Sequence, residues 1–90
     1  MTTKAEKKHY GKLASLGCIL CIRLGYGEGT PAEIHHIRKA GIRTKSPVIP
    51  LCFEHHRGNS GIHLLGAKGF YKAYNVRESD LLELALGKIA

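Results

Sequence analysis

The chain has 90 residues, of which 43% are hydrophobic, and carries a formal net charge of +7 at pH 7. A chain of this length forms one small domain with a modest core, which is often reinforced by a metal ion or by disulfides. The sequence has no apolar run long enough to cross a membrane and no secretory signal, and its positive charge favours a polyanionic partner, most simply nucleic acid.

The cysteine content argues against a disulfide framework. The chain has three cysteines, Cys18, Cys21 and Cys52, and an odd number cannot pair completely. We therefore expect a reducing, cytoplasmic setting (the host-cell cytoplasm if a phage encodes the chain), where thiolates stay available for metal.

The first third of the chain predicts a helix, a cysteine turn and a strand. Residues 4–16 have apolar side chains at helical spacing among lysines, and Gly17 ends this basic helix just before Cys18. Glycines and a proline predict a loop over residues 25–31, and residues 32–37 read as a strand.

A second strand and interrupted helical sequence follow. Residues 48–51 predict a strand that pairs with the first across a basic loop, residues 38–47. Helical sequence begins at Glu54, and Gly58 and Gly61 break it.

Two helices are expected near the C-terminus, at about residues 67–74 and 79–87. Ser79 is the expected N-cap of the second helix, and Gly87 is its expected stop.

Together these elements predict an α+β fold in one domain, residues 1–90. Its parts are a basic N-terminal helix (1–16), a metal-stabilised core (18–65) and C-terminal helices (67–90).

Two half-sites of equal spacing predict a structural zinc ion. Each of the motifs Cys-x-x-Cys and Cys-x-x-His places two ligands on one tight turn, and two such turns complete a tetrahedron. The alternatives are buried cysteines without metal, or a redox pair, which the missing βαβ context disfavours. The predicted ligands are Cys18, Cys21, Cys52 and His55.

Four further histidines suggest a second metal site. His35 and His36 are adjacent on a predicted strand, so their side chains point to opposite faces and cannot easily share an ion. His56 and His63 would be about 10 Å apart along an unbroken helix. The glycines between them permit a loop that returns His63 to His56. For any single histidine, a buried and satisfied side chain is the simpler interpretation.

These motifs resemble the HNH, or ββα-metal, nucleases, in which a β-hairpin and a helix hold one divalent ion. His35-His36 matches their metal ligand followed by the catalytic histidine, while His56 and His63 match their later histidines. The stretches AEIHHIR, VIPLC-x-x-HH and GIH-x-x-G-x-x-x-F-x-x-x-Y are more specifically similar to Ref-like phage recombination-enhancement nucleases. This resemblance covers roughly residues 18–82.

The resemblance implies a ββα-metal fold and a metal-dependent, phage-encoded endonuclease that hydrolyses DNA in recombination. DNA and a recombinase filament are the implied partners. His36 would be the general base, and His35, His56 and His63 would hold a divalent metal (Zn, Mg, Mn or Ni). Nearby cations are expected to contact phosphates without reading bases. They are Arg38, Lys39, Arg43, Lys45 and Arg57.

The sequence departs from the HNH signature at its middle residue. An Asn or Asp that orients the catalytic histidine would precede Cys52, but Lys45-Ser46-Pro47 stands there. A backbone carbonyl is one candidate partner for His36 instead. The alternative function is a non-catalytic zinc-ribbon module that binds nucleic acid. Such a module needs no base beside a second metal, so His36 separates the two.

Overall fold

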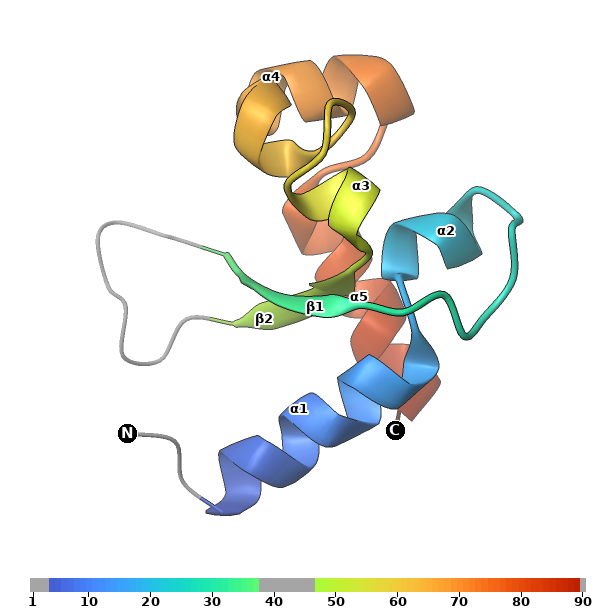
Figure 1. Cartoon of the computed structure of the whole chain (residues 1–90), viewed down its shortest axis with the longest axis vertical. Coiled ribbons are helices and arrows are strands. Elements are labelled where there is room, and N and C mark those ends of the chain that lie inside the picture. Colours follow the sequence, from blue (N-terminus) through green and yellow to red (C-terminus); the bar gives the residue numbers. More distant parts are fainter. Residues whose placement is uncertain (1–3, 38–46, 90) are drawn as a thin grey trace.

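The computed structural model describes residues 4–37 and 47–89 (Figure 1). Within these ranges the chain forms a small α+β fold, as predicted. Its elements in chain order are α1 (Lys4–Leu16), α2 (Ile19–Arg23), β1 (Glu33–His36), β2 (Val48–Leu51), α3 (Phe53–His56), α4 (Ile62–Tyr74) and α5 (Glu78–Ile89).

The two strands form an antiparallel hairpin in which Glu33 faces Leu51 and His36 faces Val48. All four residues of β2 are buried, because α1, α2 and α5 pack against this strand. Pro50 lacks a backbone N–H and is tolerated here because a two-stranded sheet leaves one edge of each strand unpaired. The expected pairing of the two strands is therefore confirmed.

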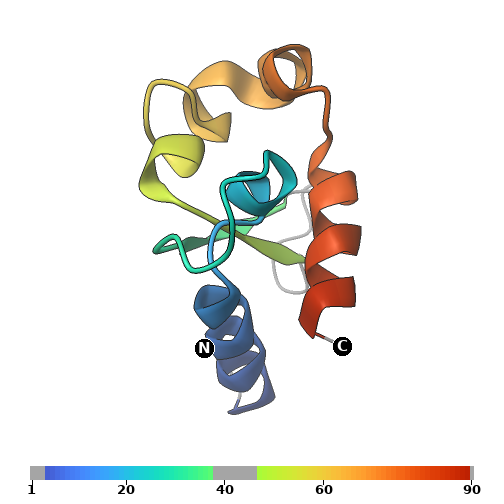
Figure 2. The same ribbon diagram turned by 90° about the vertical axis from the view of Figure 1, so that its right-hand side faces the viewer.

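Helices surround the hairpin on several sides (Figures 1 and 2). α1 lies on one side of the strands, and α4 lies on the other. α5 runs alongside the hairpin, from the end near α4 towards the end near α1. One apolar core joins these elements and includes Leu13 of α1, Leu20 of α2, Phe70 of α4 and Leu81 of α5. Among the described residues, no helix has the length and apolar character that crossing a membrane requires.

Gly17 allows the chain to close on itself after α1. It has a φ of 95°, and a Cβ at this position would lie 2.6 Å from the backbone nitrogen of Gly29. The backbone nitrogen of Gly29 donates to Leu16 O at 3.1 Å, and that of Cys18 donates to Thr30 O at 3.1 Å. The loop after α2 therefore packs on the end of α1 and leads the chain directly into β1.

α4 begins at Ile62 and not near residue 67, where a helix was expected. Gly66 interrupts it with a φ of 73° and a ψ of 172°, so the predicted helix 67–74 is its second segment. The first segment escaped prediction because it is short and lies between glycines.

α5 begins one residue before Ser79, so the prediction of Ser79 as its N-cap is wrong. The carboxylate of Asp80 accepts a hydrogen bond from the backbone nitrogen of Arg77 at 2.9 Å and secures this end instead. The predicted stop at Gly87 is also wrong. The helix continues to Ile89, whose side chain packs against the core.

We expect Gly17→Ala to lower the free energy of unfolding by about 3 kcal/mol, because both its φ and the approach of Gly29 disfavour a Cβ. Gly11→Ala is the matched control, since Gly11 is exposed in α1 and an added Cβ there meets nothing within 4 Å. It should leave stability unchanged or raise it by up to about 1 kcal/mol. Denaturant unfolding followed by circular dichroism measures both. Equal effects would show that the close approach of Gly29 does not constrain residue 17.

Candidate metal centres and catalytic site

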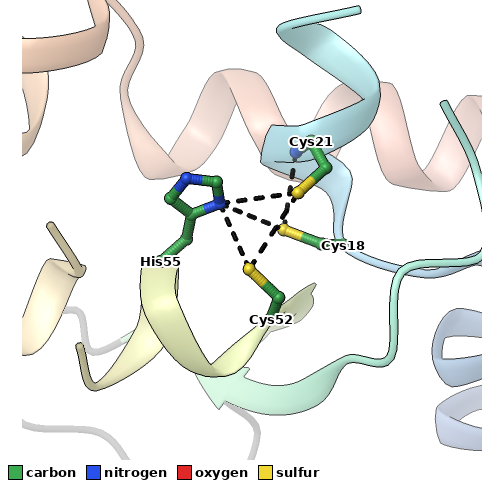
Figure 3. A group of neighbouring side chains, drawn as sticks. All are labelled: Cys18, Cys21, Cys52 and His55. Carbon is green, nitrogen blue, oxygen red and sulfur yellow. Dashed lines mark hydrogen bonds between the residues drawn. The ribbon is translucent and has the colours of Figure 1, made fainter. Parts of the chain in front are cut away.

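The four residues of the predicted zinc site converge from the starts of two short helices (Figure 3). Cys18 is the N-cap of α2, and its Sγ accepts a hydrogen bond from the backbone nitrogen of Cys21. Cys52 is the N-cap residue of α3, which carries His55. The Nδ1 atom of His55 lies 3.3 Å from Sγ of Cys52 and 3.6 Å from Sγ of both Cys18 and Cys21. The Sγ atoms of Cys21 and Cys52 are 4.0 Å apart.

These separations agree with the edges of a tetrahedral zinc site. Bonds of about 2.3 Å to sulfur and 2.0–2.1 Å to nitrogen imply corners roughly 3.6 Å (S to N) and roughly 3.8 Å (S to S) apart. The chemistry of the side chains also fits. All three cysteines are buried and reduced. Burial raises the pKa of the Cys18 thiol to about 12, so at neutral pH the thiolate that binds zinc forms only when the metal cation displaces the proton. Burial lowers the pKa of His55, which keeps its imidazole neutral and able to donate a lone pair.

A second cluster joins His35 of β1, His56 of α3 and His63 of α4. One ring nitrogen from each lies within 4.8 Å of the others. The Nε2 atoms of His56 and His63 are 2.9 Å apart. His35 is buried, while His63 is exposed, so the cluster opens to solvent on the side of His63. Three imidazoles with one open side can hold a metal and leave room for a further ligand.

The turn between α3 and α4 depends on two glycines. A Cβ on Gly58 would lie 2.7 Å from the Cα of Glu54, and one on Gly61 would lie 2.8 Å from the carbonyl oxygen of Glu54. Larger residues therefore cannot enter this turn without moving the backbone. The turn returns the chain to the end of α3, which places His63 beside His56, an arrangement that the glycines in the sequence permit.

Side-chain bonds hold the same turn from both flanks. The carboxylate of Glu54 accepts hydrogen bonds from the backbone nitrogen of Ser60, at 2.9 Å, and from its hydroxyl. The hydroxyl of Tyr74 donates to the carbonyl oxygen of Ser60 at 2.8 Å. α3 and the end of α4 are thus both anchored to the loop between the histidines.

Two carboxylates orient the histidines, and neither was among the predicted site residues. Oε1 of Glu33 accepts from Nδ1 of His56 at 2.8 Å, and Oε2 of Glu78 accepts from Nε2 of His35 at 2.6 Å. Carboxylate contacts of this kind fix the tautomer and ring orientation of metal-binding histidines. Strand alternation puts Glu33 and His35 on the same face of β1, and this pattern in the sequence could have identified Glu33. The contact of Glu78 joins distant elements, so spacing could not reveal it.

Arg57 is engaged by Glu33 through two bonds. Its Nε donates to Oε1 at 3.0 Å, and its terminal nitrogen donates to Oε2. Hydrogen bonding from Arg57, followed by that from His56, lowers the pKa of the Glu33 carboxyl. The side chain of Arg57 is still 57% exposed and therefore accessible to a phosphate. Its expected contact with a phosphate stays a prediction. The other predicted phosphate contacts lie outside the described residues: Arg38, Lys39, Arg43 and Lys45.

His36, the expected general base, is exposed, whereas its neighbour His35 is buried. Both border an open cavity of about 330 Å³ that His63 also lines. The ring of His36 meets the ring of Tyr10 edge-on, with centroids 6.3 Å apart. Among the described residues, no hydrogen bond joins His36 to a backbone carbonyl. Tyr10 is therefore the candidate for orienting the ring of His36.

We expect Gly61→Ala to weaken the binding of added divalent metal at the histidine cluster by about tenfold or more, because the turn must shift. Binding at the cysteine cluster should not change. Competition titration of zinc or nickel against a coloured chelator measures both. Gly87→Ala is the control, since Gly87 is exposed in α5 with no atom within 4 Å of an added Cβ. Unchanged metal affinity in Gly61→Ala would show that the turn does not set the cluster.

The chain has no match among curated proteins or among solved structures. Residues 2–77 match the model of a family described as recombination enhancement, RecA-dependent nuclease. The matched segment contains the hairpin, the cysteine cluster and all three histidines of the second cluster. This agrees with the Ref-like resemblance read from the motifs. Because the match covers most of its length, the chain belongs to the family of RecA-dependent recombination-enhancement nucleases.

Proposed function

We propose that this protein is an HNH-type, phage-encoded endonuclease that hydrolyses DNA phosphodiester bonds at the histidine cluster. The observation that carries the proposal is an open cluster of three histidines beside the exposed His36, in a chain of a nuclease family. Family membership also supports DNA and a RecA filament as partners. The cysteine cluster then holds a structural zinc ion that maintains this geometry.

Each residue near the cluster has a distinct task in the proposed reaction. A divalent ion held by His35, His56 and His63 would stabilise negative charge on the phosphate and on the leaving oxygen. His36 accepts a proton from the attacking water, which a neutral imidazole can do near pH 7. Its exposure gives it access to that water. The neighbouring histidine His35 is buried and bonded to Glu78, which suits a ligand better than a base.

Glu33 and Arg57 support the cluster from its rim. Because Nδ1 of His56 donates to Glu33, the Nε2 atom of a neutral ring keeps its lone pair for the metal. Arg57 holds Glu33 in place through two bonds. Its exposed guanidinium also lies beside the cluster, where it can contact a phosphate of the bound strand.

The zinc-ribbon alternative explains only half of these observations. A non-catalytic binding module accounts for the cysteine cluster. It gives no reason for three more histidines to converge, two of them held by carboxylates, next to an exposed fourth. The nuclease assignment accounts for both clusters.

Two metal ions per chain are expected. Cys52→Ala should lose the structural ion and unfold, because metal-binding free energy contributes directly to folding in small domains. His63→Ala should lose only the other ion and stay folded, since His63 is exposed. Elemental analysis and circular dichroism, with and without chelator, measure these outcomes. A Cys52→Ala chain as stable as the wild type in chelator would rule out the structural zinc.

His36→Ala should slow strand cleavage by about 100-fold or more while leaving both metals bound, because it removes only the general base. The assay is nicking of supercoiled plasmid with Mg, Mn, Ni or Zn, with and without a RecA filament. Glu83→Ala, an exposed change on α5, is the control. The nuclease assignment fails if the wild type is inert under every condition, and the role of His36 fails if the variant cuts equally fast.

A further inference from the structure

A second cavity of about 410 Å³ lies next to the proposed catalytic cavity. Its apolar lining includes Ile37, which directly follows β1, together with Ile62 and Phe70 of α4, and all three are buried. Neither metal cluster uses these side chains. An apolar hollow of this size is typical of sites that bind a small ligand or one unit of a larger one.

One wall of the cavity is aromatic and positively charged. The guanidinium of Arg77 lies 5.0 Å from the ring centroid of Tyr71, and both residues line the cavity. Tyr71 is 43% exposed, so much of its ring surface has no protein partner. Lys68, also exposed, adds a second positive charge. The carboxylate of Glu78 is the acidic group in the lining, and it is bonded to His35.

The two cavities are neighbours that share two lining residues. Ile62 and Glu78 line both the cavity beside His36 and the apolar one. A polymer whose phosphate lies at the histidine cluster therefore has its neighbouring unit within reach of the apolar cavity. For a DNA strand, that unit is the nucleoside next to the cleaved bond.

We propose that this cavity binds an unpaired nucleobase of the DNA strand that is cut, so that the substrate is single-stranded or locally unpaired DNA. This inference rests on the proposed nuclease function and specifies its substrate. Ile37, Ile62 and Phe70 would take the base out of water. Tyr71 and Arg77 offer the ring and guanidinium planes on which bases stack.

The charge and shape of the site favour this occupant over an apolar peptide. Arg77 and Lys68 can neutralise the phosphates on either side of the bound base. A base inside a duplex is stacked and paired, so it must leave the helix to enter a cavity. Stacking tolerates every base, and the site is therefore expected to favour unpaired DNA without reading its sequence.

The test compares two single strands of equal charge, twelve-unit oligothymidylate and a twelve-unit strand of abasic sites. Fluorescence anisotropy with the full-length His36→Ala protein, which should not cut, measures their binding. Oligothymidylate should bind about tenfold more tightly, because stacking one base contributes a factor of this size. Tyr71→Ala, introduced into this protein, should abolish the preference, whereas Tyr71→Phe should retain it. Tyr26→Ala, at an exposed tyrosine outside the cavity lining, should also retain it.

Equal binding of the two strands, or a preference that survives Tyr71→Ala, would overturn the base-binding site. Cleavage by the wild-type protein is scored separately, with and without a RecA filament, on a single strand, a fully paired duplex and a duplex with an unpaired segment. Equal cleavage of all three would also overturn the proposal and leave the nuclease function intact. Base-dependent binding with no cleavage of any DNA would support the cavity and remove the nuclease function, so the two failures are distinguishable.

Discussion

The cysteine cluster is the constraint on which the remaining structure depends. It joins the start of α2 to the start of α3, two segments separated by the whole of β1 and β2. With Cys52 and His55 turned towards the other cysteines, the rotation of α3 about its axis is set. Successive residues of a helix point about 100° apart, so His56 must then face away from the cysteines. It faces Glu33 and His63 instead. One pair of adjacent histidines thus links the site that stabilises the fold to the site proposed for chemistry.

Much of this arrangement was predictable, because local spacing determined it. The matched half-sites indicated the cysteine cluster, and alternation along β1 separated buried His35 from exposed His36. The proximity of His63 to His56 was only permitted by the sequence. It follows from Gly58 and Gly61, where the backbone of α3 leaves no space for a Cβ.

What sequence reasoning missed is non-local. The bond from His35 to Glu78 joins a strand to the last helix, and no periodicity relates the two. The first segment of α4 and the true start of α5 were missed for a related reason. The first segment of α4 ends at Gly66, and the start of α5 is set by the hydrogen bond between Asp80 and the backbone of Arg77. The spacing of apolar residues over such short stretches indicates neither feature.

The position of Glu78 explains why α5 belongs to the proposed site and is more than a cover for the hairpin. This first residue of α5 holds His35 and borders both cavities. Further along the helix, Leu81 and Ala85 are buried in the core on which β2 also packs. Any shift of α5 along the hairpin would therefore move the partner of His35 and the wall of the apolar cavity together. The proposed metal site and the proposed site for a base are therefore coupled through one helix.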